Sequence, residues 1–224
     1  MSRRYTMWNL ADTSDVDRAE GIMMGDSITA PYIGNLPTIC AYIYTLQESR
    51  TRPGILMHAA PGYTISQQYA IWTSPTLNPY ATNSMVKWAS LQLGINNAGN
   101  AGGSQTEAQM ATDMQTFVNR INSDIPSAKV LLIPNTPCRA GGAAGLSDAQ
   151  WAQLSAFNND LLGTGAHPIT GSNIVRMPLW SAMDDGTGTL QSWANSGDGV
   201  HITAAARQYE AAAIRLTLQQ NGLL

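Results

Sequence analysis

Five apolar segments recur along the chain at intervals of roughly 30–40 residues, and this spacing constrains the fold more than any other feature. The segments are residues 20–26, 55–60, 85–93, 129–134 and 173–179. Helical patterns fill the intervals between them. Strands that alternate with helices are typical of βαβ crossovers, which require a parallel sheet covered on both faces. The sequence therefore predicts an α/β fold with a five-stranded, mainly parallel sheet and helices on both of its faces.

Several helices carry recognisable start signals. Ser104–Glu107 and Ser147–Gln150 match the capping box, in which a hydroxyl caps a free N–H while the residue three positions later reaches back. Residues 31–49 are helix-like, and a shorter helical pattern follows Gly62. Thr203 is expected to cap a final helix. The helical pattern after Thr203 is carried by Tyr209, Ala212, Ala213 and Leu216.

Length and charge limit the classes of partner. A chain of 224 residues predicts one domain, residues 1–224, with residues 1–19 as an N-terminal lead-in. A net charge of −3 argues against nucleic acid or an anionic membrane as the partner. No apolar run reaches the roughly 18 residues that would predict a membrane-spanning helix. Oligomeric state is left open.

Compartment and cysteine chemistry are also left open. The N-terminal residues lack the apolar region of a secretory signal, yet an extracellular or virion-associated protein stays compatible with the neutral, polar composition. Cys40 and Cys138 lie far apart without a CxxC motif, so two free thiols are the simplest interpretation, with a disulfide or a metal site as alternatives. No His/Cys/Asp cluster has metal-ligand spacing, so neither a metal nor another cofactor is expected.

Four polar features follow the predicted strands. In parallel sheets, ligands bind beyond the carboxyl ends of the strands. Ser27, Gly62, Asn96 and the loop that contains His201 all occupy such positions. We therefore expect one site, formed by these four segments.

A serine nucleophile needs a base to take its proton and an acid to orient that base. His201 follows Asp198 by three residues, so the carboxylate can reach the imidazole within one turn. This pattern makes Ser27, His201 and Asp198 the expected nucleophile, base and orienting acid. His58, within the second strand, is interpreted as a core residue and His167 as a plain loop residue.

Acyl transfer also requires N–H donors where the oxyanion forms. A glycine backbone N–H at Gly62 and the side-chain amide of Asn96 follow neighbouring strands and can supply them. Either residue on its own is more often part of a turn.

Four short motifs in this order resemble the sequence blocks of the SGNH (GDSL-like) hydrolase family over roughly residues 20–220. They are GDSIT from Gly25, the glycine at position 62, GINN from Gly94 and DGVH from Asp198. The resemblance implies a three-layer α/β/α, flavodoxin-like fold with five parallel strands. It also implies that Ser27 is the nucleophile and, through its backbone N–H, an oxyanion donor.

The same resemblance assigns the other roles. Gly62 and Asn96 would complete the oxyanion hole, His201 would act as general base and then acid, and Asp198 would orient it. The sequence departs from the family at Asn97, where the third block usually has Asp, and this weakens the expected role of position 97 in bracing its loop. The second block is compressed around Gly62.

Substrate class is predicted from the loops. Trp180 and Trp193 flank the segment that leads into Asp198, and their indoles can stack on a sugar or line an acyl pocket. The alternative is that at least one packs on the core. Loops rich in Gly, Asn, Ser and Thr, without a large apolar insertion, favour hydrolysis of a short acyl ester, such as acetate, on a polar or carbohydrate alcohol. The alternatives are a lipase or thioesterase of the same family, or a catalytically weak carbohydrate-binding or virion adhesion module.

Overall fold

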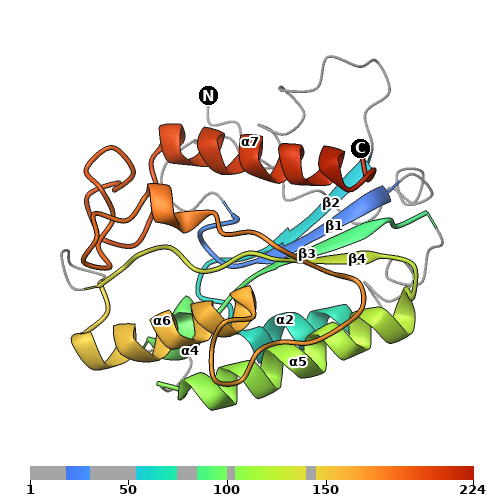
Figure 1. The fold of residues 1–224 in the computed structure, drawn as a ribbon, viewed down its shortest axis with the longest axis horizontal. Helices are drawn as coiled ribbons and strands as arrows, with labels where there is room; N and C mark the ends of the chain where they lie inside the picture. Colours follow the sequence, from blue (N-terminus) through green and yellow to red (C-terminus); the bar gives the residue numbers. More distant parts are fainter. Residues whose placement is uncertain (1–18, 31–53, 75–84, 100–103, 140–144) are drawn as a thin grey trace, which may run out of the picture.

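A computed structural model describes residues 19–30, 54–74, 85–99, 104–139 and 145–224 (Figure 1). All five predicted strands are confirmed, and they form one sheet in which every strand is parallel to its neighbours. The order across the sheet is β2-β1-β3-β4-β5. The strands are β1 Ala19–Gly25, β2 Gly54–Ala59, β3 Trp88–Gln92, β4 Lys129–Leu132 and β5 Ile174–Arg176.

Helices cover both faces of this sheet, which confirms the three-layer α/β/α architecture (Figure 1). α7 lies along one face, and α2, α4, α5 and α6 lie along the other. The central strands are therefore buried on both sides, and every residue of β3 is buried. The described helices are α2 Ile65–Trp72, α4 Ile95–Ala98, α5 Glu107–Asp124, α6 Asp148–Leu162, α7 Ala204–Gln220 and the 3₁₀ turn η3 Trp180–Ala182.

The predicted start of α5 is wrong by two residues. Thr106, and not Ser104, caps this helix, and Gln109 supplies the reciprocal side chain. Both residue pairs fit the capping pattern, and a long-range contact decides between them. The backbone N–H of Gln105 donates to the carbonyl oxygen of Asn97 at 2.8 Å, which keeps Gln105 outside the helix. The predicted caps at Ser147 and Thr203 are confirmed.

The last helix buries a different face from the one on which its pattern was recognised. Tyr209 and Leu216 are exposed, by 42% and 54%. Arg207 and Glu210, two charged residues, are almost fully buried instead. The four apolar residues of this face recur at helical spacing, but that pattern gives no sign that two charged residues lie among them. The buried residues of α7 are Ala206, Arg207, Glu210, Ala211, Ile214 and Leu218.

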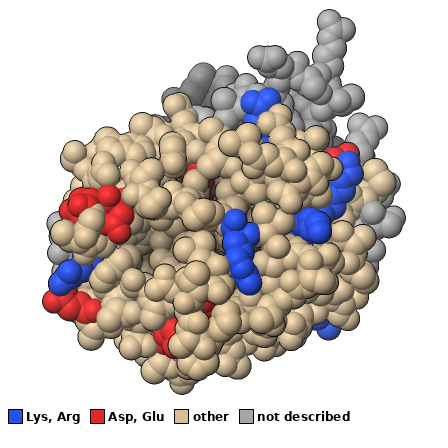
Figure 2. All heavy atoms as spheres, viewed as in Figure 1, with Lys and Arg blue, Asp and Glu red and all other residues tan. Residues whose placement is uncertain are grey.

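The other predictions concern the helix over residues 31–49, the cysteines, membrane spans and surface charge. The helix predicted over residues 31–49 lies outside the described residues, and so does Cys40. Cys138 is buried and is a free thiol within the described ranges. None of the described helices is both long and apolar enough to cross a membrane. Figure 2 shows that charged side chains are sparse on the face in view, as the charged content of 12% leads us to expect.

Candidate active site

Ser27 lies in a tight turn at the carboxyl end of β1. The backbone N–H of Ala30 donates to the carbonyl of Asp26 at 2.8 Å, which closes the turn immediately after the strand. Gly25 must lack a side chain, because a Cβ there would lie 2.1 Å from Thr29 Oγ1. Asp26 Oδ1 accepts the N–H of Ile28 at 2.9 Å. The turn therefore holds Ser27 at the edge of the sheet, with its side chain largely buried.

A second turn, Asn195–His201, carries the other two residues of the predicted triad. Asn195 Oδ1 accepts the N–H groups of Gly197 at 2.8 Å and Gly199 at 3.1 Å. Both glycines have positive φ, of 109° and 84°, a conformation that other residues rarely adopt. Asp198 Oδ1 accepts the N–H groups of Val200 at 3.0 Å and His201 at 2.8 Å. The backbone itself thus orients the carboxylate.

The two turns meet at the same edge of the sheet. His201 Nε2 lies 2.9 Å from Ser27 Oγ, and His201 Nδ1 lies 2.5 Å from Asp198 Oδ2. Burial opposes ionisation of Asp198, but hydrogen bonds from the His201 ring and from the N–H groups of His201 and Val200 outweigh it and lower its pKa. The carboxylate is therefore charged near neutral pH. Such a chain can move a proton from a hydroxyl to an imidazole.

Asn96 lies beside this chain, on the short helix α4. Its Nδ2 donates to the carbonyl of Tyr63 at 3.0 Å and to Asp26 Oδ2 at 3.4 Å. The turn before α4 depends on Gly94, whose φ is 136° and whose Cβ would lie 2.8 Å from Asn135 Nδ2. Gly62 has a φ of 80° and is exposed in the turn after β2. The oxyanion roles of Asn96 and Gly62 stay predictions.

Asn97 does brace its surroundings, contrary to the expectation from the missing Asp. Its side chain is 1% exposed, and its Oδ1 accepts the N–H of Ile65, the first residue of α2, at 3.1 Å. Its Nδ2 donates to Gln105 Oε1 at 2.6 Å. The amide therefore supplies the acceptor that a carboxylate would supply, together with a donor that matches Gln105.

A buried polar group under the Ser27 turn was not predicted from the sequence. Arg207 Nη1 donates to the carbonyl of Ile28 at 2.8 Å. Its Nη2 donates to the carbonyls of Ser27 at 3.3 Å and Ala30 at 3.2 Å. The available signal was an arginine six residues after His201, which helical periodicity alone does not distinguish from a surface residue.

Two acidic residues share this buried region. Burial raises the pKa of Asp26 to about 7, against the opposing effects of the Ile28 N–H and the Arg207 charge. Burial likewise raises the pKa of Glu210 to about 8, although Arg207 and a hydrogen bond from Gln92 oppose the rise. The Gln92 amide donates to Glu210 at 2.7 Å.

The two tryptophans differ in their environments. Trp180 is 6% exposed, and its indole N–H donates to the carbonyl of Pro134, so it packs in the core. Trp193 is 40% exposed and packs edge-to-face on Tyr209, with ring centroids 6.1 Å apart. Of the two, only Trp193 presents a substantial ring surface.

The other two histidines lie elsewhere. His58 is partly buried on β2, and this burial lowers its pKa. His167 lies in an exposed loop, as predicted, but its ring contacts Glu107 at 2.7 Å.

Comparison with known proteins agrees with this geometry. Residues 23–209 match the model of the GDSL-like lipase/acylhydrolase family. No curated protein matches the chain.

A GDSL-like lipase from Bacteroides thetaiotaomicron has a TM-score of 0.66 at 17% identity, covering 92% of this chain and 89% of its own. The lipase/acylhydrolase from Enterococcus faecalis has a TM-score of 0.65 at 19% identity, covering 90% and 96%. An acetylxylan esterase from Geobacillus stearothermophilus has a TM-score of 0.62 at 15% identity, covering 88% and 93%. These structures share the fold, and the family match spans most of the chain. The protein therefore belongs to the GDSL-like lipase/acylhydrolase family, whose activities are of the esterase and lipase type.

Proposed function

We propose that the protein is a serine-dependent carboxylic ester hydrolase that removes short acyl groups, acetyl in particular, from a polar or carbohydrate alcohol. The observation that carries the proposal is the chain of contacts from Ser27 Oγ to His201 Nε2 and from His201 Nδ1 to Asp198. These contacts give a weakly acidic hydroxyl both a base and an orienting anion.

In the proposed mechanism, Ser27 Oγ attacks the carbonyl carbon of the ester while His201 Nε2 takes the hydroxyl proton. The ionised Asp198 stabilises the imidazolium that forms. His201 then donates this proton to the departing alcohol oxygen, and the acyl group stays on Ser27. A water molecule, deprotonated by His201, attacks the acyl-enzyme. The bond from the acyl carbon to Ser27 Oγ then breaks, His201 returns its proton to Ser27 Oγ, and the carboxylic acid is released.

The tetrahedral oxyanion would be held by the backbone N–H groups of Ser27 and Gly62 and by the side-chain amide of Asn96. One N–H of Asn96 is engaged by Tyr63 at 3.0 Å, whereas the contact with Asp26 is longer, at 3.4 Å. The contact with Asp26 is therefore the weaker of the two and the one that an oxyanion would replace at the smaller cost.

The preference for a short acyl group on a polar alcohol is supported by the loop before Asp198 and by Trp193. The loop before Asp198 is stabilised by polar turns at Asp184 and Asp185, which accept N–H groups of Gly186, Gly188 and Thr187. Trp193 offers an exposed indole beside this loop, a surface suited to the apolar face of a sugar ring. The similar fold of an acetylxylan esterase is consistent with this substrate class.

Initial rates on p-nitrophenyl esters from acetate to decanoate test the proposal, with Ser27→Ala compared with Ser127→Ala. Ser127 is an exposed serine just before β4, at the opposite end of the sheet, and is the matched control. We expect the highest rate on acetate and a loss of roughly 10⁴–10⁶-fold in kcat in Ser27→Ala alone. A fluorophosphonate probe should label Ser27 in the wild type and in Ser127→Ala.

Each other outcome points to a different function. Rates that rise with acyl length would shift the substrate to lipids or thioesters while keeping the mechanism. A protein that neither turns over an ester through Ser27 nor reacts with the probe would be a binding module that retains the fold, and the proposed mechanism would be wrong.

A further inference from the structure

The carboxyl group of Asp160, on α6, is buried, and only one of its two oxygens has a hydrogen-bond partner among the described residues. The residue is 0% exposed, and its Oδ1 accepts the backbone N–H of His167 at 2.8 Å. Among the described residues, its Oδ2 has no hydrogen-bond partner. The loop after α6 closes tightly over this group, because a Cβ at Gly165 would lie 2.1 Å from Asp160 Oδ1. A buried carboxyl oxygen left without a partner is costly and calls for a compensating ligand.

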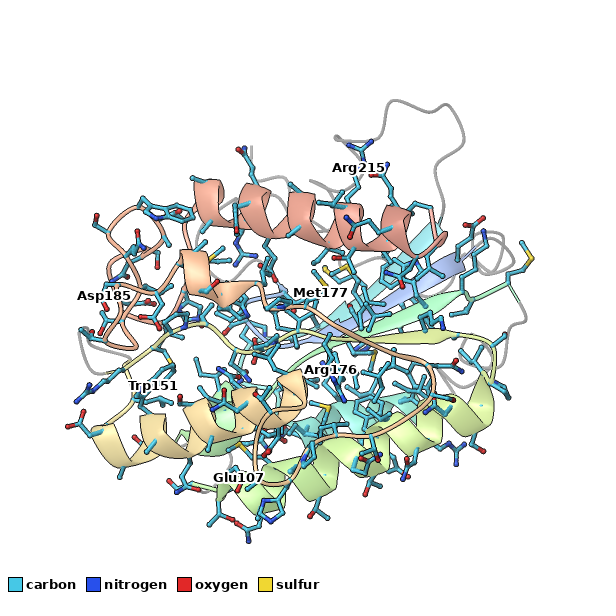
Figure 3. All side chains as sticks on the ribbon, in the orientation of Figure 1. Glu107, Trp151, Arg176, Met177, Asp185 and Arg215 are labelled. Atoms are coloured by element: carbon cyan, nitrogen blue, oxygen red, sulfur yellow. The ribbon has the colours of Figure 1, made fainter. Side chains whose placement is uncertain are left out.

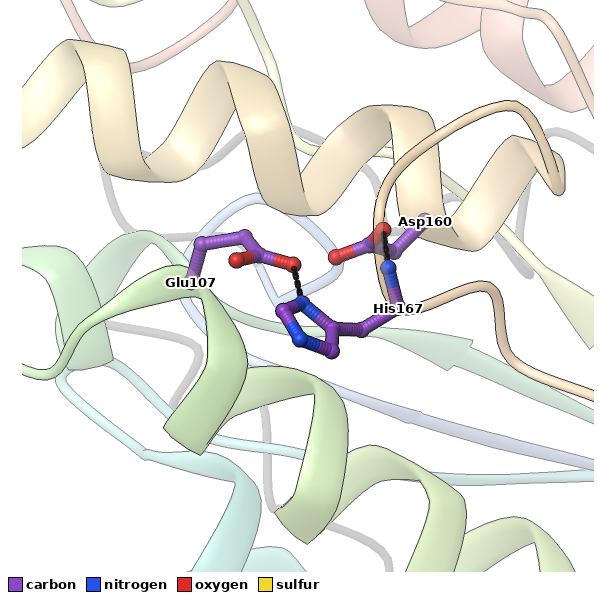
Figure 4. A group of neighbouring side chains, drawn as sticks. All are labelled: Glu107, Asp160 and His167. Atoms are coloured by element: carbon purple, nitrogen blue, oxygen red, sulfur yellow. Dashed lines mark hydrogen bonds and ion pairs between the residues drawn. The ribbon is translucent and has the colours of Figure 1, made fainter.

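Two further ligand-type side chains face Asp160 from other segments (Figure 4). Glu107 is the first residue of α5, and His167 lies in the loop between α6 and β5. His167 Nδ1 lies 2.7 Å from Glu107 Oε1. One atom from each of the three side chains lies within 4.8 Å of the other two. The Glu107 side chain is 14% exposed and that of His167 is 55% exposed, so an ion has access from the His167 side.

Positive charge is needed between the two carboxyl groups. Ionised carboxylates only accept hydrogen bonds, so Glu107 cannot satisfy the free oxygen of Asp160. A proton shared between the two carboxyl groups is the alternative, and it leaves the His167 ring paired with Glu107 alone. A divalent cation engages both carboxylates and the ring nitrogen at once.

We propose that Glu107, Asp160 and His167 form a site for one divalent transition-metal ion, and that Zn²⁺ fits it best. One imidazole nitrogen and two carboxylate oxygens, completed by water, give the four ligands that Zn²⁺ takes in a tetrahedral arrangement. Ca²⁺ and Mg²⁺ prefer all-oxygen ligand sets, which makes them poorer candidates. Mn²⁺ accepts similar ligands at lower affinity.

Binding requires the three ligand atoms, which lie within 4.8 Å of one another, to reach a common spacing. Ligand atoms at 2.0–2.1 Å from a tetrahedral Zn²⁺ lie about 3.3 Å apart. The contact between His167 Nδ1 and Glu107 Oε1 therefore has to open by a fraction of an ångström from 2.7 Å. His167 is the residue that can move, because its ring is more than half exposed while Asp160 is fixed by burial.

The loop that carries His167 is anchored at both ends. Arg176, on β5 (Figure 3), donates to the carbonyls of Leu161 at 3.1 Å and Ile169 at 2.6 Å. A bound ion would join the start of α5, the end of α6 and this loop. The cluster belongs to the helix layer opposite α7, whereas the Asn195–His201 turn leads into α7 (Figure 1). The metal would accordingly stabilise the fold and take no part in ester hydrolysis.

Calorimetric titration of the full chain with ZnCl₂, after removal of metals with a chelator, tests the site at about pH 7.5. We expect one ion to bind per chain and the thermal midpoint to rise with Zn²⁺ concentration. Asp160→Asn and His167→Gln should each weaken binding by about 10–100-fold or more. His167→Gln alters an exposed ring, so it stays informative even where Asp160→Asn folds poorly.

Two controls separate this site from the ester site and from surface carboxylates. Asp148→Asn changes an exposed carboxylate on the same helix and should bind Zn²⁺ as the wild type does. His201→Ala changes the proposed ester site and should also retain binding. This control is needed because Zn²⁺ can bind a catalytic histidine in the absence of any separate metal site. Absence of binding by the wild type, or binding that survives His167→Gln but is lost in His201→Ala, would overturn the proposal.

Discussion

Arg207, on α7, holds the backbone of the Ser27 turn through hydrogen bonds. Its guanidinium donates to three carbonyl oxygens, those of Ser27, Ile28 and Ala30. A planar group with several donors in fixed directions can hold three acceptors at once, whereas the lysine ammonium is a point charge on a flexible stem. The position of Ser27 Oγ relative to His201 therefore depends on a residue that does not touch the substrate.

Replacing Arg207 by lysine should lower kcat by roughly 10–100-fold with a smaller change in KM, because the reacting oxygen loses its alignment. Steady-state kinetics on p-nitrophenyl acetate measures both constants. Arg120→Lys, on the surface of α5, is the matched control. A purely structural role would reduce the thermal midpoint of Arg207→Lys while leaving kcat of the folded enzyme unchanged.

Asp198 should matter through the orientation of the His201 ring. In Asp198→Asn the new amide can donate to Nδ1, which favours the tautomer with the proton on Nε2 and prevents proton transfer from Ser27. We expect kcat to fall by roughly 10²–10⁴-fold while the fold is retained. Asp185→Asn, an exposed turn residue in the preceding loop, should leave kcat unchanged, and a similar loss in both variants would contradict this role.

At the scale of the elements, all five strands could be predicted from the sequence, whereas the start of α5 and the buried face of α7 could not. Long apolar runs identify buried parallel strands because both sides of each strand are covered. The start of α5 depended on the contact between Gln105 and Asn97, which no local pattern contains. The buried face of α7 carries Arg207 and Glu210, and burial of such residues depends on partners from β3 and the Ser27 turn.

The side chain of Asn97, on α4, accepts the N–H of Ile65 at the start of α2, and a substitution at this position tests how much the contact contributes to stability. Asn97→Asp keeps the acceptor for the N–H of Ile65 but places a carboxylate oxygen against Gln105 Oε1, which now lies 2.6 Å from the amide donor. We expect a loss of about 1–3 kcal/mol in the free energy of unfolding, measured with urea, because a buried acceptor loses its donor. Asn119→Asp, on the exposed face of α5, is the control. Unchanged stability in Asn97→Asp would show that Gln105 reorients freely.

At the scale of the whole molecule, parallel order brings distant segments to one edge. The carboxyl end of β1, the helix after β3 and the loop before α7 meet there, so motifs placed after strands predicted Ser27, Asn96, Asp198 and His201 as neighbours. Clusters that are not at strand ends escaped prediction. Glu107, Asp160 and His167 come from the helix layer, with no fixed spacing in the sequence.

The buried acids should make the stability of the whole fold depend on pH. Burial raises the pKa of Asp26 from 3.8 to about 7 and that of Glu210 from 4.5 to about 8. Between the lower and upper values the folded protein binds more protons than the unfolded chain, so the free energy of unfolding falls as pH rises through this window.

We expect urea denaturation from about pH 5 to about pH 8 to show a smaller loss of stability in Glu210→Gln than in the wild type. The amide keeps an oxygen that can accept the hydrogen bond from Gln92. Glu20→Gln, which alters an exposed ion pair with Lys87, should follow the wild-type curve. Parallel curves for wild type and Glu210→Gln would show that Glu210 does not retain its proton in the folded state.

Ser27 and His201 are 174 residues apart in the chain, and their contact exists only when β1 and the last loop are both in place. Cleavage of a chromogenic ester under the proposed mechanism would therefore report the completion of folding. During refolding, activity would recover only as the contact between Ser27 and His201 forms. Two fragments from a chain split between Ser27 and His201 would each be inactive and would regain activity on reassembly. This arrangement is therefore a basis for a complementation assay.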